Sequence, residues 1–213
     1  MNNKIIPMET QEMPITIYSE MTPNPNTMKF VANKMLVQED IVVEYSNASE
    51  AKGSSAIAEA LFAFPFVKGV FIARNFITVS KMPAIEWDDI TLELRLFIAD
   101  SLKQNQVVVS TLPAPKESSE GVAEKAPSPV FEPVITSDAD QQIVNLLDEF
   151  VRPAVENDGG AIHFKSFSEG IVTVILKGSC SGCPSSTATL KGGVEQLLKS
   201  HLPDVKEVVA EAH

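Results

Sequence analysis

Four short runs within the first hundred residues have the pattern of strands. Residues 15–18 and 28–31 place their side chains on two sides in turn, as strands do. Two further runs, 67–74 and 76–81, are rich in β-branched and aromatic residues and are separated only by Asn75, which predicts a hairpin. This part of the chain is therefore expected to form a sheet.

Two segments of the same region have the spacing of helices. Residues 54–64 repeat apolar side chains at i, i+4 and i+7, and Ser54 or Ser55 can cap the start of that helix. A second helix is expected over residues 87–103, with one apolar face formed by Ile90, Leu94, Phe97 and Ile98. Strands covered on one side by two helices make an α+β domain.

The last third of the chain begins with another helical pattern. We expect Asp138 to cap a helix that Pro153 bends or ends, with the apolar positions Ile143, Leu146, Leu147 and Phe150. The sequence Asp158-Gly159-Gly160 then predicts a turn, because glycine adopts backbone angles that other residues avoid.

Strands follow at residues 162–167 and 171–176, and the second is almost wholly β-branched and apolar, which predicts that it is buried. The next segment predicts a helix capped by Ser185 or Ser186, with an apolar side made of Leu190, Val194, Leu197 and Leu198. Residues 205–209 can form a final strand. This region is thus a second small α+β unit.

Between the two units lies a segment dominated by Pro, Ser, Glu and Ala without apolar periodicity. Such a composition buries too little apolar surface to offset the loss of chain entropy, so a flexible, semi-extended linker is expected. We therefore predict a domain at residues 1–104, a linker at 105–137 and a second domain at 138–213.

The net charge of −11 at pH 7 excludes some partners. Nucleic acids and anionic membrane surfaces bind proteins mainly through clustered Lys and Arg, and this sequence contains no basic run, so neither is expected as a partner. It also has no apolar stretch near the ~18 residues that span a bilayer, and no segment of signal-peptide character at its start. A cytoplasmic location is the simplest expectation, although an organellar protein whose leader was removed would look the same.

The 213 residues contain only two cysteines, Cys180 and Cys183, in a glycine-containing loop between the predicted strand 171–176 and the helix after it. This spacing lets both sulfurs face one point. The amino end of the helix offers free N–H groups and partial positive charge, which lower the pKa of a thiol. We therefore expect a thiolate pair that binds a metal or attacks a disulfide.

Three kinds of chemistry fit such a pair. A dithiol oxidoreductase would cycle between thiols and a disulfide, but here Ser179 precedes the motif where an aromatic residue is usual. Structural zinc takes four ligands, and the three histidines (His163, His201 and His213) lack the usual close spacing, which leaves open a zinc ion shared by two chains through four cysteines. A cubane iron–sulfur cluster takes four thiolates, which a symmetric dimer with two per chain would supply. A cluster held in this way would be easy to release, which suits transfer to other proteins.

At this motif the sequence resembles the C-terminal domain of the NifU family. The resemblance covers roughly residues 138–210 and rests on Asp158-Gly159-Gly160 together with residues 176–186, which read Leu-Lys-Gly-Ser-Cys-Ser-Gly-Cys-Pro-Ser-Ser. The first half resembles the N-terminal domain of Nfu-type proteins through the sequence Thr22-Pro23-Asn24-Pro25-Asn26 and residues 61–79.

The resemblance implies a non-enzymatic scaffold or carrier. Such a protein binds a [4Fe–4S] cluster (with [2Fe–2S] as the other type open from the residues alone) between two chains. It receives the cluster from upstream scaffolds and passes it to apo iron–sulfur proteins. By the resemblance the ligands are Cys180 and Cys183, and the cluster-bound form is a homodimer. The first domain has a good core and no visible chemistry, so we hypothesise that it recognises recipients or upstream scaffolds.

Three other features have plain structural readings. Asp158 is expected to form the turn before Gly159, and His163 to point to the outer face of its strand rather than to act as a ligand. The two prolines of residues 22–26 fix an extended loop, which either presents a surface to a partner or is only a turn.

Overall fold

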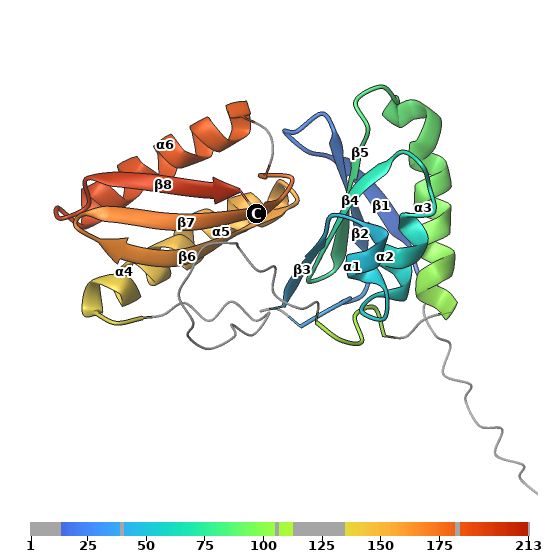
Figure 1. Ribbon diagram of the computed structural model, residues 1–213, viewed down its shortest axis with the longest axis horizontal. Helices are drawn as coiled ribbons and strands as arrows, with labels where there is room; N and C mark the ends of the chain where they lie inside the picture. Colours follow the sequence, from blue (N-terminus) through green and yellow to red (C-terminus); the bar gives the residue numbers. More distant parts are fainter. Residues whose placement is uncertain (1–13, 39–40, 105–106, 113–134, 182–183, 213) are drawn as a thin grey trace, which may run out of the picture.

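The computed structural model describes residues 14–38, 41–104, 107–112, 135–181 and 184–212. It contains two α+β units that lie side by side, each with its own sheet and hydrophobic core (Figure 1). This arrangement confirms the predicted fold class of two small α+β domains. The N-terminal domain comprises strands β1–β5 with helices α1–α3, and the C-terminal domain comprises α4–α6 with β6–β8.

The N-terminal domain is built on a five-stranded antiparallel sheet in the order β1-β2-β5-β4-β3. Its strands are β1 (Ile17–Met21), β2 (Thr27–Ala32), β3 (Val42–Tyr45), β4 (Val67–Ala73) and β5 (Phe76–Lys81). Its helices are α1 (Ala48–Ala51), α2 (Ala56–Leu61) and α3 (Trp87–Gln104). All three helices lie on the side of the sheet that is turned away from the other domain (Figure 1).

The two faces of this sheet follow from strict alternation along the strands. Phe30, Val70 and Ile77 point toward the helices and join a core with Leu61 and Leu94. The opposite face, which we call the helix-free face, carries Lys29, Val31, Glu44, Phe71, Ala73, Phe76 and Thr78. Most of these side chains are also buried, so something other than a helix covers them.

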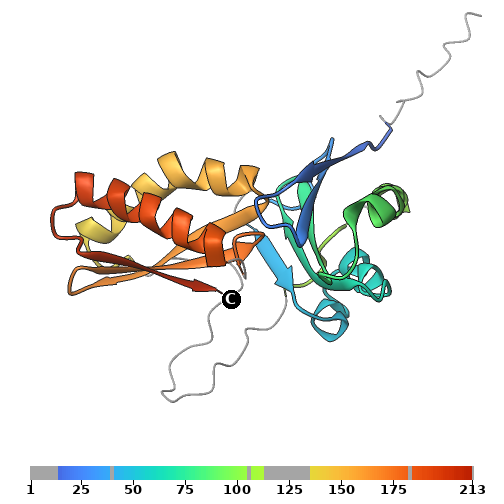
Figure 2. The same ribbon diagram turned by 90° about the horizontal axis from the view of Figure 1, so that it is seen from above.

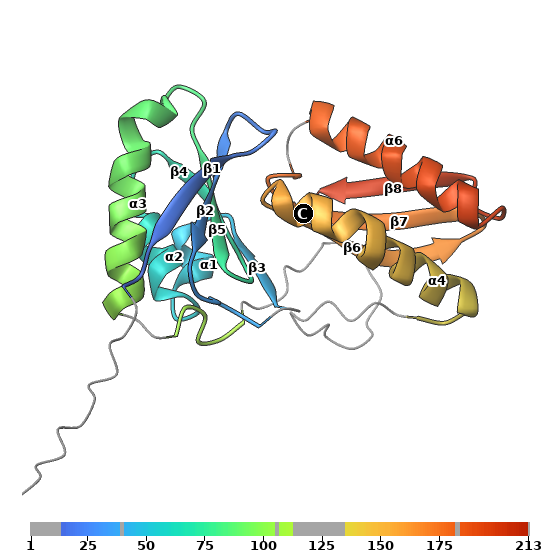
Figure 3. The same ribbon diagram turned by 180° about the vertical axis from the view of Figure 1, so that it is seen from behind.

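The C-terminal domain has a three-stranded sheet in the order β6-β7-β8, with β6 antiparallel to β7 and β8 parallel to it. The strands are β6 (Gly160–Ser168), β7 (Ile171–Gly178) and β8 (Glu207–Ala212). The helices are α4 (Asp138–Leu146), the π-helical turn η1 (Leu147–Val151), α5 (Arg152–Asn157) and α6 (Pro184–His201). These helices cover a single face of the sheet (Figure 3).

Most of the predicted elements are present, and two further ones were not foreseen. The hairpin of β4 and β5, helices α2 and α3, and strands β1, β2, β6 and β7 lie where the patterns placed them, with ends shifted by a few residues. Ser55 caps α2 by accepting a hydrogen bond from the N–H of Ala58. Strand β3 and the one-turn helix α1 were missed, and the last strand starts at Glu207 rather than at residue 205.

Both predicted helix caps of the C-terminal domain were wrong, and the prediction for Pro153 holds at most in part. Ser137, not Asp138, caps α4, because its hydroxyl accepts from the N–H of Asp140 while the Asp140 carboxylate accepts from the Ser137 N–H. Of the two effects expected of Pro153, bending or ending the helix, the ending does not occur: a π-helical turn precedes α5, which has Pro153 in its first turn and continues to Asn157. Ser185 and Ser186 lie inside α6, which begins at Pro184.

Part of the predicted linker contacts the N-terminal domain. Residues 107–112 lie beside the start of α2, where Ser55 donates to the carbonyl of Val108 at 2.7 Å and Val108 is buried. The rest of the linker up to residue 134 lies outside the described residues.

Within the described part of the chain, no helix has both the length and the apolar character needed to cross a lipid bilayer.

Candidate functional site

Strand β7 ends where the N-terminal domain meets the C-terminal domain, and it carries Cys180 to that point. Gly178, the last residue of β7, has a φ of +68°, a conformation that favours glycine and turns the chain out of the sheet. Ser179 then holds the loop to the preceding helix–strand turn, because its N–H and its hydroxyl donate to the carbonyls of Gly159 and Asp158. Cys180 follows directly after this anchored turn.

The Cys180 sulfur packs tightly against the start of β6. A Cβ atom on Gly160 would lie 2.8 Å from Cys180 Sγ and 2.7 Å from the Lys177 carbonyl oxygen, so only glycine leaves room for the sulfur. Cys180 is 7% exposed and belongs to the core of the C-terminal domain. It lines a cavity of about 410 Å³ between the domains, together with Pro23, Ala154, Val155, Asp158, Ser179, Thr189 and Leu190.

The expected low pKa of this cysteine is not found. Burial raises the pKa of the Cys180 thiol, a hydrogen bond with Ser179 lowers it, and the negative charge of Asp158 raises it further. The net shift is upward, so this arrangement of the chain favours the thiol over the thiolate. The argument from the helix end was wrong because it weighed only local partners and not the desolvation that the fold imposes.

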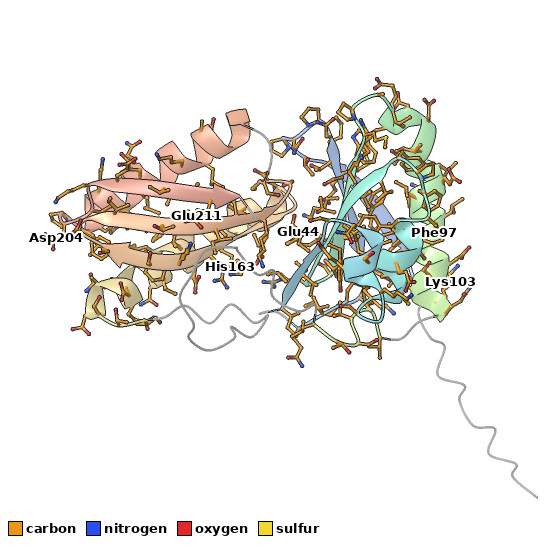
Figure 4. All side chains as sticks on the ribbon, in the orientation of Figure 1. Glu44, Phe97, Lys103, His163, Asp204 and Glu211 are labelled. Carbon is orange, nitrogen blue, oxygen red and sulfur yellow. The ribbon has the colours of Figure 1, made fainter. Side chains whose placement is uncertain are left out.

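The N-terminal domain contacts the cysteine loop on both sides of Cys180. The Asn24 side chain donates to the Ser179 carbonyl at 3.2 Å. The Glu44 carboxylate accepts from the Gly178 N–H at 3.2 Å. It also lies 3.4 Å from the Ser181 hydroxyl, whose single proton has its shorter bond, 2.8 Å, to the Gly178 carbonyl. Figure 4 shows Glu44 at the boundary between the two domains. The loop is thus held by side chains that lie more than 130 residues earlier in the sequence.

A second group of contacts joins the helix-free face to the turn before β6. Thr78 donates to the Gly159 carbonyl at 2.8 Å, and Lys29 donates to the Asn157 carbonyl at 3.2 Å. Phe71, Ala73 and Phe76 form a small apolar cluster with Ala161 of the C-terminal domain. The C-terminal domain therefore covers the helix-free face of the sheet, as the view from above also shows (Figure 2).

Of the two predicted ligands, the structure places Cys180, while Cys183 lies outside the described residues. Asp158 ends α5 and forms the expected turn, and it also lines the cavity beside Cys180. Among the residues that the structure describes, no three His, Cys, Asp or Glu side chains gather as a metal site. The described part of one chain thus offers Cys180 without a complete set of ligands around it.

Sequence reasoning did not identify Asn24 and Glu44 as neighbours of the site. Asn24 belongs to residues 22–26, whose two prolines suggested either a surface for a partner or only a turn. In the structure this segment contacts the chain's own cysteine loop through Asn24. Asn24 is buried, and its side-chain oxygen also accepts from the N–H of Asn26. Glu44 carried no sequence signal, since β3 itself was not predicted.

His163 lies on the side of β6 that faces away from the C-terminal helices, as predicted, and burial governs its charge. Burial lowers its pKa from 6.5 to about 3, helped by the positive charges of Lys177 and Arg152. The folded chain therefore keeps His163 neutral where the unfolded chain protonates it. We expect the free energy of unfolding to fall as the pH drops from about 6.5 toward 3, by at most ~1.4 kcal/mol per pH unit.

Urea titrations at pH 7.5 and pH 5.0 measure this effect. Between these pH values the free energy of unfolding of the natural chain should fall by about 2 kcal/mol through His163. That of a His163→Gln variant should fall correspondingly less. Asp140 does not interfere, because its pKa is lowered and its contribution changes only at still lower pH. Burial alone would raise that pKa, but hydrogen bonds from Thr136 and Ser137 outweigh it. The same pH dependence in both proteins would contradict the assignment to His163.

Two family models match this chain. Residues 17–105 match the model described as the N-terminal part of the scaffold protein Nfu/NifU. Residues 143–209 match the model described as the NifU-like domain. The two matches fall on the two α+β units, one on each side of the cavity that contains Cys180.

Similar proteins carry consistent names. A protein of Schizosaccharomyces pombe called "NifU-like protein C1709.19c" is 32% identical over 201 residues, which cover 92% of this chain and 72% of that protein. The "NFU1 iron-sulfur cluster scaffold homolog, mitochondrial" of Drosophila sechellia is 34% identical over 195 residues, and its counterpart in Drosophila erecta has the same identity. These matches cover 90% of this chain but only 63% of the length of the Drosophila proteins.

Among solved structures, the solution structure of a NifU-like protein from Saccharomyces cerevisiae is similar to this chain. Its TM-score is 0.40 at 22% sequence identity, and the match covers 52% of this chain and 98% of that one.

Proposed function

Because the chain belongs to the Nfu/NifU-like family, we propose that it is an iron–sulfur cluster scaffold that carries a [4Fe–4S] cluster between two copies of itself and transfers it to apo-proteins. Cys180 and Cys183 of each copy would be the ligands. The observation that carries this proposal is the number of cysteines in the chain compared with the number of ligands that a cluster needs. The whole chain has two cysteines, three positions apart, where a cubane cluster takes four thiolates.

The local structure supports this use of the loop. Cys180 stands at the junction of β7 and α6 beside a cavity of about 410 Å³, and Gly160 lets the backbone at the start of β6 pass close to the sulfur. The start of α6 supplies N–H groups and partial positive charge, which stabilise an anionic cluster. A cluster bound at the surface shared by two chains has only two protein bonds per chain. Recipient thiolates can therefore replace these bonds one at a time, without a change of oxidation state.

A transfer assay tests the proposal. The chain is loaded anaerobically with ferrous iron, sulfide and a thiol reductant. It is then mixed with an apo-protein whose activity depends on a [4Fe–4S] cluster, in the presence of an iron chelator. We expect the loaded chain to restore activity under conditions in which equal amounts of free iron and sulfide do not. Restoration that is no better than with free iron and sulfide would contradict the proposal.

The alternative from the same cysteine pair, a dithiol oxidoreductase, predicts a different result. It requires catalytic turnover of a disulfide substrate and no bound iron after loading. The names of the similar proteins favour the scaffold, because they describe cluster scaffolds.

The cellular compartment also remains a proposal. The Drosophila relatives are described as mitochondrial, which does not fit the expectation of a purely cytoplasmic protein. We therefore favour the second option that the sequence allowed, an organellar protein, and fractionation of the source cells with detection of the native chain distinguishes the two.

A further inference from the structure

We propose that the helix-free face of the N-terminal sheet is a docking surface for the chain's own cysteine loop, and that it competes for this loop with a second copy of the chain. This inference rests on the proposed function, since the second copy is the partner that a shared cluster requires. In the docked form the loop is closed and carries no cluster. Cluster loading would separate the domains.

The contacts of Asn24, Glu44 and Thr78 are the first support. Asn24 contacts the Ser179 carbonyl, Glu44 contacts the Gly178 N–H and the Ser181 hydroxyl, and Thr78 contacts the Gly159 carbonyl. The first two side chains thus contact residues on both sides of Cys180, and the third contacts the turn that supports the loop. No covalent or metal link is needed for this arrangement. Three hydrogen bonds between the N-terminal domain and this loop with its supporting turn indicate a surface shaped for them.

The position of the sulfur is the second support. Cys180 is buried, and Pro23 of the N-terminal domain forms part of the wall of its cavity. A cluster that lies between two chains needs this sulfur at the surface of its own chain, facing the partner. The docked N-terminal domain and a second chain therefore cannot both lie against the loop in the way that cluster sharing demands.

The charge of Glu44 is the third support. Its carboxylate accepts a hydrogen bond from the Gly178 N–H, two residues before Cys180, and it lies 3.4 Å from the Ser181 hydroxyl, one residue after Cys180. A thiolate-ligated cluster is itself an anion that is stabilised by such donors. Glu44 therefore stabilises the empty loop and would repel a bound cluster, so the same side chain favours one state and disfavours the other.

The interface is also of a kind that can open. Its apolar cluster joins Phe71, Ala73 and Phe76 to the small side chain of Ala161, and polar contacts, including the ion pair of Arg74 with Glu156, surround it. Mixed interfaces of this kind within one chain resemble transient protein–protein contacts.

The labelling rate of Cys180 tests the docking directly. In a full-length Cys183→Ser chain Cys180 is the only thiol, and its reaction with a maleimide is followed without metal. We expect the Glu44→Ala variant of this chain to react about tenfold faster or more, because a hydrogen bond to a charged group commonly contributes a factor of that size. Thr78→Val, which removes a donor with little change of shape, should also raise the rate. Glu93→Ala, a change on the exposed surface of α3, should not.

Cluster loading of the chain with both cysteines distinguishes a failure of the docking proposal from a failure of the proposed function. We expect Glu44→Ala to load faster than the natural chain and to reach the same final iron content. If Glu44→Ala and Thr78→Val remain folded by circular dichroism and label at the rate of their parent, the docking surface is overturned, while normal loading would leave the proposed function standing. Faster labelling without cluster binding in any variant would instead overturn the proposed function, and the competition with it.

Discussion

Replacing Cys180 by Ala is expected to reduce the bound iron from about two atoms per chain to nearly none, because the change removes two of the four thiolates from a shared cubane cluster. Half-occupancy is not expected, since every cluster in the dimer would lack the same two ligands. The change should also abolish the dimer that depends on the cluster. Iron and sulfide analysis after anaerobic loading, with size-exclusion chromatography under argon, measures both effects.

A matched control is Ser200→Ala near the exposed end of α6, which should load like the natural chain. Cys183→Ala should behave like Cys180→Ala if both sulfurs bind the cluster. Retention of more than half of the iron by the Cys180→Ala variant would show that this sulfur is not a required ligand.

Gly160→Ala is expected to destabilise the C-terminal domain by about 1–3 kcal/mol, the usual cost of forcing extra atoms into a close-packed site. The new Cβ would approach both Cys180 Sγ and the Lys177 carbonyl oxygen to less than 3 Å. Neither neighbour can move freely, because Lys177 is paired in the β6–β7 ladder and Cys180 belongs to the core. Differential scanning calorimetry should show a lower transition temperature, and cluster loading should be slower.

The opposite result is expected at a glycine without neighbours. A Cβ on Gly193, in the exposed middle of α6, would meet no atom within 4 Å, so Gly193→Ala should stabilise the helix by about 0.5–1 kcal/mol. If Gly160→Ala is as stable as the natural chain while Gly193→Ala behaves as expected, the close packing around Cys180 is not as the structure describes it.

The parts of the fold that could be predicted are those whose signal is local. The apolar run of β7, the hairpin of β4 and β5 and the capped helix α2 each carry their pattern within a few consecutive residues. Strand β3 could not be predicted because it has only four residues and is defined by its pairing with β4, a contact distant in sequence. The cap of α4 was misplaced by one residue because Ser137 and Asp138 are both good capping residues, and only the reciprocal hydrogen bonds with Asp140 decide between them.

The candidate site divides in the same way. Cys180 could be singled out as a candidate because two cysteines in a glycine-containing loop form a local pattern. Its surroundings could not be found, because Asn24 and Glu44 approach it only after the two domains have docked. The upward shift of the Cys180 pKa has the same origin, since burial outweighs the helix end and depends on the whole fold.

The most direct measurement of the central claim is native mass spectrometry of the chain after anaerobic loading. We predict that four irons and four sulfides are found only on a species with the mass of two chains, and that single chains carry no cluster. A [4Fe–4S] cluster on single chains, or two chains that assemble and load equally well after both cysteines are replaced by Ala, would contradict a cluster shared through Cys180 and Cys183.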